Sequence, residues 1–391
     1  MASPLSGLKI LDFTYLLPGP YGSMMLADMG ADIIKVENRN APDMARFMPP
    51  FINGVSALYA HLNRGKRSMS IDLKKKQGAD IVRSLVREYD IVLEQFRPGV
   101  MARLGLGYED LKQINPAVIY CSLTGYGQNG PYADRAGHDI NYCALSGIES
   151  YSGRRDTGPC PEGIQIADIC GGSKNLAIGV LAAYISRTRT GRGDHVDISM
   201  ADSAFALTVF SAAGYLAGAR EPGREAELFN GGSMYDFYET SDRGYLSVGP
   251  VEQKFFAGFC SAIGVPELAP GGIMANLADP AAKGAVARLI REKPLSHWRR
   301  VFSSRDACVE PVLSLGEACG SDLFRQRGMI VTLSDGAGGS FVQIGNPVKF
   351  ASGDCLASVP GGCGGNDKDS VLGSLGYSGD EIQALKDSGI V

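Results

Sequence analysis

Residues 8–36 read LKILDFTYLLPGPYGSMMLADMGADIIKV, and this stretch decides the fold. Residues 8–12 and 32–36 are short apolar runs of the kind found in buried strands. The residues between them, 23–29, favour a helix that ends at Gly30. A strand, turn, helix and second strand in this order predict an α/β protein with a doubly wound, Rossmann-like large domain. The turn lacks Gly-x-Gly-x-x-Gly, so the sequence does not indicate a dinucleotide site.

Cations and glycines follow several of the next predicted strands. Residues 91–93 are apolar and lead into Glu94-Gln-Phe-Arg-Pro-Gly99, and basic residues surround a short strand near residue 70. The strand at residues 118–121 runs into a turn-rich loop, residues 124–131. Because ligands of open α/β sheets bind at the carboxyl edge of the strands, these loops predict a phosphate-binding edge. The alternative is an ordinary solvated charged surface.

Composition excludes several classes of protein. The chain has 391 residues, 45% of them apolar and 20% charged, with a formal net charge of −4. These values are typical of a soluble globular protein and indicate neither a nucleic-acid partner nor a membrane surface. The apolar runs are expected to be too short to span a bilayer. The first residues do not resemble a signal peptide, and the last four are not a peroxisomal address.

The cysteines argue for a reducing compartment. There are nine, an odd number, at irregular spacing and without Cys-x-x-Cys. This pattern is neither a disulfide framework nor a zinc site, so we expect a cytoplasmic protein without a bound metal. Cys143 and Cys170 flank the reactive stretch described next, and we interpret them as buried packing residues.

Residues 135–174 carry the expected chemistry. His138 follows Gly137, and thirty residues later Asp168 precedes Gly171-Gly172-Ser173 and an apolar run at helical spacing. The Gly-Gly-Ser triplet predicts a helix N-terminus, whose free N–H groups would stabilise an oxyanion. His138 and Asp168 would then be two proton-transfer groups. The residues alone leave the alternative open that the histidine is structural and the aspartate only caps the helix.

The motifs Gly-His138-Asp-Ile-Asn-Tyr and Ala-Asp168-Ile-Cys-Gly-Gly-Ser resemble those of the α-methylacyl-CoA racemases, within the family III CoA-transferases. The resemblance extends from Leu5 to about Pro311. It implies an enzyme that racemises or epimerises 2-methylacyl-CoA thioesters by 1,1-proton transfer through an enolate. Coenzyme A would be part of the substrate, and no separate cofactor is implied.

The resemblance also assigns individual residues. His138 and Asp168 would be the two bases, one for each face of the α-carbon, and Glu252 would orient the histidine. The residues that would hold coenzyme A are Ile71, Leu73, Lys74, Gln95, Phe96, Arg97 and Arg103. Members often carry an arginine near the end of the second strand for the nucleotide, and this chain has Asn38 and Arg39 there.

Two alternatives to the racemase remain. In a family III CoA-transferase Asp168 would be the covalent acyl carrier, but such enzymes generally lack His138 and carry a Gly-rich loop at the position of residues 249–252. A non-catalytic acyl-CoA binder would need no acid–base pair. Ile164, Gln165 and residues 230–234 depart from the racemase pattern in segments that line the family's acyl pocket, which implies an unusual acyl group.

The domain organisation follows from composition and from the resemblance. Residues 219–227 form a polar linker, and we expect a large domain at residues 1–220, a smaller α+β domain at 225–325, and a return to the large domain at 326–391. Gly-rich stretches at 335–339 and 353–365 predict loops, and residues 378–386 predict a capped helix. Family members form interlocked dimers, so the resemblance implies a homodimer.

Overall fold

The computed structural model describes residues 3–277, 279–336, 338–351, 353, 355–357, 359–362 and 367–391. The chain divides into two compact units. The larger consists of Met1–Leu145, Gly163–Leu207 and Asp322–Val391, and the smaller of Ser146–Glu162 and Thr208–Ser321. Residues 146–162 therefore lie in the smaller unit, although the sequence placed them inside an expected domain at 1–220.

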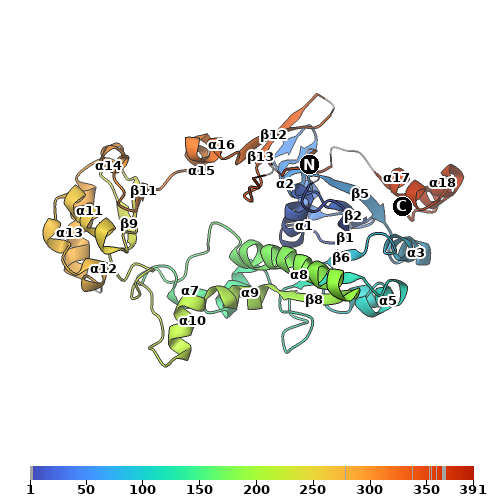
Figure 1. Cartoon of the computed structure of the whole chain (residues 1–391), viewed down its shortest axis with the longest axis horizontal. Coiled ribbons are helices and arrows are strands. Elements are labelled where there is room, and N and C mark those ends of the chain that lie inside the picture. Colours follow the sequence, from blue (N-terminus) through green and yellow to red (C-terminus); the bar gives the residue numbers. More distant parts are fainter. Residues whose placement is uncertain are drawn as a thin grey trace. The chain divides into compact units, whose positions relative to one another are not determined.

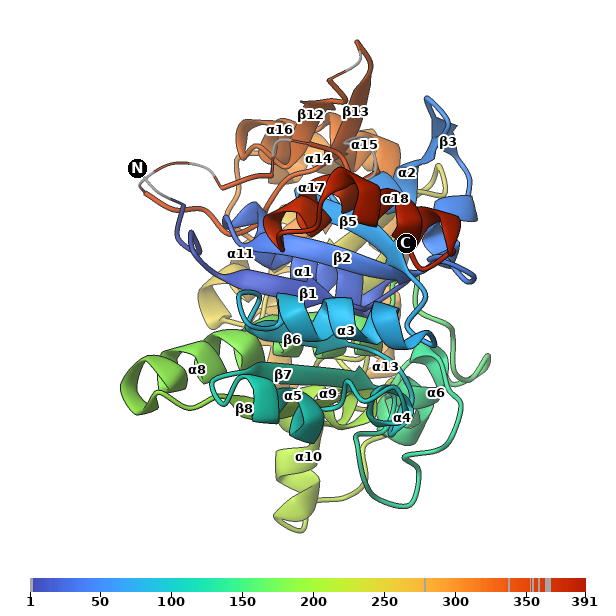
Figure 2. The ribbon, with the colours of Figure 1, turned by 90° about the vertical axis from the view of Figure 1, so that its right-hand side faces the viewer.

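A six-stranded parallel sheet forms the centre of the larger unit (Figure 2). Its strands are β1 (Lys9–Asp12), β2 (Asp32–Asn38), β5 (Lys66–Ile71), β6 (Ile91–Glu94), β7 (Ile119–Thr124) and β8 (Asp194–Ser199). They are ordered β5-β2-β1-β6-β7-β8, and every neighbouring pair is parallel. This is the Rossmann strand order. Successive strands lie on one side of β1 as far as β5 and on its other side from β6 onward, so the order of connection reverses between β1 and β6. The predicted α/β fold class is confirmed.

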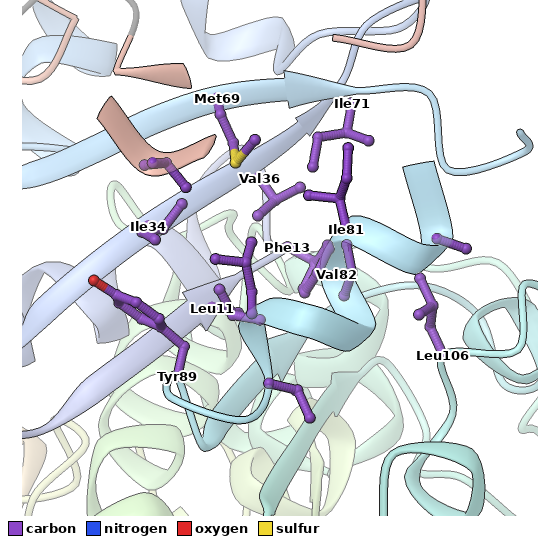
Figure 3. Close-up of a cluster of buried hydrophobic side chains, with 14 of the residues drawn as sticks. Leu11, Phe13, Ile34, Val36, Met69, Ile71, Ile81, Val82, Tyr89 and Leu106 are labelled. Carbon is purple, nitrogen blue, oxygen red and sulfur yellow. The ribbon is translucent and has the colours of Figure 1, made fainter. Parts of the chain in front are cut away.

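One face of the sheet carries the main core of this unit (Figure 3). Branched side chains of the strands, such as Leu11, Ile34 and Val92, pack there on helices from distant parts of the chain. Those helices are α3 (Lys76–Leu85), α5 (Tyr108–Ile114), α17 (Lys368–Ser374) and α18 (Gly379–Asp387). The last of them begins after Ser378, whose hydroxyl accepts from the Glu381 N–H in a capping box, near the helix expected at 378–386. The C-terminal segment thus completes the core.

Other helices of this unit carry the reactive stretch or pack against it. They are α1 (Pro18–Asp28), α6 (Asp139–Leu145), η2 (Ile166–Ser173), α8 (Lys174–Thr190) and α9 (Met200–Leu207). Helix α8 packs on β7, β8 and α1, as a helix covering a sheet does. The continuous helix Ile166–Thr190 is nonetheless long and apolar enough to cross a bilayer, contrary to the expectation from sequence that no run would be.

The buried Arg64 holds the returning C-terminal segment on the larger unit. Its guanidinium pairs with Asp28 at 2.6 Å and donates to the main-chain oxygen of Ile344 at 2.8 Å. Ile344 ends strand β13 (Ser340–Ile344), which pairs antiparallel with β12 (Ile330–Ser334). Cys363 and parts of the two predicted Gly-rich loops lie outside the described residues.

The smaller unit has an antiparallel sheet and a helical layer with their own core. Strands β9 (Asp236–Glu239), β10 (Tyr245–Val248) and β11 (Val309–Pro311) lie in the order β11-β10-β9. The main helices are α10 (Val209–Leu216), α11 (Gln253–Ile263), α13 (Pro280–Arg291) and α14 (Leu295–Phe302) (Figure 1). Arg154 binds Asp236 at 2.7 Å and Glu225 at 2.9 Å, which ties residues 146–162 to this unit.

Candidate active site

A cavity of about 750 Å³ opens at the point where the strand order of the sheet reverses. Its walls come from the loops that follow β1, β6 and β7, together with α6 and η2. His138 and Asp168 both line it, so the structure brings together the two residues that the sequence proposed as a pair. In open α/β sheets this crevice is where ligands bind.

His138 stands immediately before helix α6, and its side chain is exposed toward the cavity. Its main-chain N–H donates to Asn141 Oδ1 at 3.0 Å, and its carbonyl accepts from the Asn141 N–H at 2.8 Å. The backbone of His138 is therefore fixed by a local turn. The imidazole remains on the solvent-accessible side of the cavity, where a substrate can reach it.

Asp168 lies in the first turn of η2 and is partly buried. Burial, and secondly the nearby Asp139 carboxylate, raises the pKa of Asp168 to about 6, while His138 acts in the opposite direction. A carboxyl with such a pKa exchanges its proton near neutral pH, which suits a general acid or base.

Asp139 connects the two halves of the site. It is the first residue of α6, next to His138, and its Oδ1 accepts the main-chain N–H of Asp168 at 2.9 Å. Its actual contact is with the turn that carries Asp168, which no motif spacing indicates.

The predicted helix start at Gly171-Gly172-Ser173 is wrong. The helix begins five residues earlier, at Ile166, and the three residues lie inside a π-helical segment that continues into α8. A Cβ at Gly171 would come within 2.8 Å of Ser203, and one at Gly172 within 2.9 Å of Met200. The two glycines therefore permit close packing of η2 on α9.

Because the helix starts earlier than predicted, the N–H groups that could stabilise an oxyanion also belong to earlier residues. The N–H of Asp168, in the first turn, is already bonded to the Asp139 carboxylate. The first residues of a helix have N–H groups that no intrahelical carbonyl can reach, and here these belong to Ile166 and Ala167. The π-helical geometry at Asp168 fits the association of such segments with functional sites.

Three of the predicted coenzyme A contacts line the cavity, all of them in the loop after β6. They are Gln95, Phe96 and Arg97. The Gln95 amide is engaged within the protein, because its Oε1 accepts from the Gly19 N–H at 3.0 Å and its Nε2 donates to the Tyr15 carbonyl at 3.1 Å. The Phe96 ring lies 6.0 Å from that of Tyr15, while Arg97 is exposed. Gln95 is thus a brace between two loops, and Arg97 is available to a ligand anion.

The other four predicted contacts are not among the residues lining this cavity. Ile71 is fully buried in the core, and Leu73 packs against the same cluster. Lys74 and Arg103 are exposed. Their binding roles stay predictions.

A second hollow, of about 360 Å³, opens where β2 and β5 end, and Arg39 and Arg46 reach it. Arg46 pairs with Glu37 at 2.7 Å, and Arg39 donates to the main-chain oxygen of Val391. The arginine expected near Asn38 is therefore present at this edge, already in contact with the C-terminal segment.

Glu252 belongs to the smaller unit, where it is the exposed N-cap residue of α11. Its carbonyl accepts from the Phe256 N–H at 2.9 Å. Its partnership with His138 stays a prediction. In the first departure from the racemase pattern, Gln165 lines the cavity, whereas Ile164 does not and is exposed. The second departure, residues 230–234, belongs to the smaller unit.

Tyr142 and Arg135 also line the cavity, although the sequence did not single them out. The Tyr142 hydroxyl donates to the Gly137 carbonyl at 2.6 Å, and burial, with Asp168 next, raises the pKa of Tyr142. Arg135 stacks on Tyr132 with its guanidinium carbon 3.8 Å from the ring centre. The signal for Tyr142 was its position four residues after His138, which directly precedes helix α6.

Comparison with known proteins now decides the family. Residues 5–361 match the model of CoA-transferase family III. The chain belongs to CoA-transferase family III. It is 36% identical to an α-methylacyl-CoA racemase of Mus musculus over 84% of this chain and 82% of the relative. It is 33% identical to an acetyl-CoA:oxalate CoA-transferase of Acetobacter aceti over 92% of each.

Solved structures agree with this placement. A CaiB/BaiF family protein from Brucella suis superposes with a TM-score of 0.83 at 30% identity, covering 96% of this chain and 100% of the other. Racemases and transferases thus both occur among the relatives of this family III chain. The protein is an enzyme of the family III CoA-transferase and racemase class, and an acyl-CoA substrate is consistent with that class.

Proposed function

We propose that this enzyme racemises or epimerises 2-methylacyl-CoA thioesters by 1,1-proton transfer. The observation that carries the proposal is that His138 and Asp168 line one cavity. Proton transfer at both faces of a carbon requires two such groups. The resemblance of both motifs to racemases supports the same reaction.

The chemistry begins with loss of the α-proton. One of the two side chains accepts this proton, and the electrons of the broken C–H bond move onto the thioester oxygen to form an enolate. The other side chain then donates a proton to the opposite face, and the enolate electrons form the new C–H bond. The direction of the reaction decides which residue begins as the base.

Stabilisation of the enolate supplies much of the rate, because a thioester α-proton is far more weakly acidic than either side chain. A well-placed N–H donor contributes roughly 3 kcal/mol in comparable oxyanion sites. The N–H groups of Ile166 and Ala167, at the start of η2, are the candidate donors. The raised pKa of Asp168, about 6, brings its proton affinity closer to that of the imidazole.

The alternative is a CoA-transferase, and the match to the acetyl-CoA:oxalate enzyme over 92% of each chain favours considering it. The Asp168 carboxylate would attack the acyl carbon of the donor thioester and release the CoA thiolate, giving a mixed anhydride. The thiolate would then attack the Asp168 carbonyl, so that the aspartate carries CoA as a thioester and the donor acid leaves. This route has no evident use for His138.

Deuterium incorporation distinguishes the two reactions. Racemisation of 2-methylacyl-CoA in deuterated water should place deuterium at the α-carbon, and His138→Ala should abolish epimer interconversion while CoA still binds. A His61→Ala variant is a matched control, because His61 is outside the cavity lining. A covalent adduct on the Asp168 peptide, trapped by hydroxylamine during turnover with a free acid and without α-deuterium, would contradict the racemase.

We also propose a homodimer, supported by apolar side chains exposed on the two units. In the larger unit they include Ile178 and Phe205, 62% and 58% exposed. In the smaller unit, α10 has no buried residue although its sequence is VFSAAGYL. Light scattering on the purified protein should give twice the mass of one chain, and a monomer at micromolar concentration would contradict the proposal.

A further inference from the structure

Glu94 is a buried carboxyl that the reaction above does not use. It is the last residue of β6, at the edge of the cavity, and only 4% of its surface is exposed. Its register partner on β7 is Ser122, whose partner on β8 is Asp197. The three side chains therefore form one row across the sheet.

A chain of polar contacts leads from Glu94 toward solvent. The Ser122 hydroxyl, on the neighbouring strand, lowers the pKa of the Glu94 carboxyl, and the Ser122 Oγ lies 3.0 Å from His195 Nε2. His195 is half-buried and stacks on Tyr108 with 5.1 Å between ring centres.

Glu94 also fixes the loop that forms one wall of the cavity. Its Oε2 accepts the main-chain N–H of Phe96 at 2.8 Å. The intervening Gln95 bonds to the loop after β1 through the Gly19 N–H and the Tyr15 carbonyl. One carboxyl therefore anchors the turn that presents Phe96 and Arg97, and through Gln95 it couples that turn to the opposite wall.

We propose that Glu94 is a positioning residue whose charge sets the affinity of the cavity for coenzyme A, and that Ser122 and His195 carry its proton to and from solvent. The proposal rests on the proposed function only in taking coenzyme A as the ligand. An ionised acceptor forms a shorter and stronger hydrogen bond with an N–H than a neutral one does. The Phe96 turn is therefore held more firmly when Glu94 is charged.

The surroundings of Glu94 set its charge near neutral pH. Burial, with a smaller contribution from Asp197, raises the pKa of Glu94 to about 7 against the lowering effect of its bonds to Ser122 and Phe96. The other ionisable groups that face it, in the described part of the chain, are the uncharged side chains of Tyr15, Tyr120 and Cys121. Burial also lowers the pKa of His195, which favours a neutral imidazole that can relay a proton.

The test is calorimetric binding of dephospho-CoA to the whole protein from pH 6 to pH 8. This probe lacks the 3′-phosphate monoester, whose own proton would titrate in the same range. The wild-type dissociation constant should fall about fivefold from pH 6 to pH 8. This ratio corresponds to roughly 1 kcal/mol of binding free energy. Glu94→Gln should bind with the weak, low-pH constant throughout, with kcat at saturating substrate within about twofold of wild type.

Two further variants keep the proposal falsifiable. Glu88→Gln, which changes an exposed acid paired with Lys9, should retain the wild-type pH slope. Ser122→Ala removes a bond that lowers the pKa of Glu94, so the midpoint should move to higher pH. This shift decides the matter if Glu94→Gln does not fold, because an unmoved midpoint would overturn the proposal.

The remaining outcomes separate this proposal from the proposed function. A wild-type slope retained in Glu94→Gln, or a loss of kcat without a change in binding, would overturn the role of Glu94. Wild-type binding that is tight but independent of pH would also overturn it and leave the proposed function standing. Failure of the wild-type protein to bind any CoA compound would instead overturn the proposed function and this inference together.

Discussion

Acids of the sheet and of the cavity beside it behave in opposite ways. In the half formed by β1, β2 and β5, Asp12 pairs with Lys66 at 3.1 Å and Glu37 with Arg46 at 2.7 Å. Despite burial, these cations and further hydrogen bonds lower the pKa of each acid to about 2. At Glu94, the last residue of β6, and at Asp168, on η2, burial instead raises the pKa, to about 7 and about 6.

The difference lies in the partner that each acid has. Asp12 and Glu37 face fixed cations and stay charged at every pH at which the protein works, so their function is structural. Asp168 faces a second carboxylate, and Glu94 faces hydroxyls and another acid. Acids in such surroundings exchange protons near neutral pH, and Asp168 lines the candidate site while Glu94 directly precedes lining residues.

The largest effect is expected on kcat, for a change at Asp168. Asp168→Asn keeps the shape of the side chain and removes its proton transfer, so kcat should fall about 10³-fold, within the range typical of a lost acid or base. CoA binding should persist. Asp139→Asn is the matched control and should cost much less, because its amide oxygen can still accept the Asp168 N–H. A loss under tenfold in Asp168→Asn would show that this carboxyl is not reactive.

A change at an acid that is paired with a buried cation should lower the free energy of unfolding. Asp12→Asn leaves the buried Lys66 ammonium without its counter-charge, and breaking a buried pair in this way costs about 3–5 kcal/mol of unfolding free energy. Urea denaturation followed by circular dichroism measures the change. Asp80→Asn, which removes an exposed pair with Arg83, should leave the midpoint unchanged. Equal urea midpoints for the two variants would show that the buried Asp12–Lys66 pair does not stabilise the fold more than an exposed pair does.

The two groups of acids should also make the stability of the fold depend on pH in opposite ways. Asp12 and Glu37, with lowered pKa values, stabilise the fold above their ordinary pKa values, and this stabilisation is lost as pH falls toward about 2. Asp168 and Glu94, with raised values, bind protons more tightly in the folded protein, so stability should decline as pH rises toward about 6 and 7. Unfolding measured from pH 3 to pH 8 should therefore show a maximum, and Glu94→Gln should flatten its alkaline side. An unchanged alkaline side in that variant would contradict the assignment.

The smallest effect concerns an exposed cation at the cavity. Arg97→Ala should weaken CoA binding about fivefold at low ionic strength and less at high ionic strength, because salt screens exposed charges. Arg103→Ala, which changes a nearby exposed arginine outside the cavity lining, provides the comparison. Equal losses in the two variants would indicate a diffuse positive surface, whereas unchanged affinity in Arg97→Ala would rule out its assignment.

The parts of the fold that sequence predicted are those set by local patterns. Apolar runs gave β1, β2, β6 and β7, since burial on both faces of a parallel sheet demands such runs. The pairing of His138 with Asp168 in one cavity rested on the resemblance of both motifs, because thirty residues separate them. The brace by Gln95 could not be predicted, because it joins two loops that only the fold brings together.

The errors share a physical cause. Gly171 and Gly172 were interpreted as the start of a helix, whereas close packing against α9 decides their identity. Residues 146–162 were expected in the large domain because they adjoin it in sequence, but Arg154 finds its partners, Asp236 and Glu225, in the smaller unit. In both cases a tertiary contact overrode a local signal.

The contacts of the Arg64 side chain are completed late in synthesis, because Ile344 lies far along the chain. A ribosome finishes β1 to β8 and then translates the smaller unit before it reaches β13, α17 and α18, which complete the packing around Arg64 and the core. At about 5–20 residues per second, that interval is on the order of ten seconds. During this time the nascent sheet exposes an apolar face and an arginine without all of its partners. A chaperone that covers apolar strands would find its substrate in this interval, before the last helices emerge.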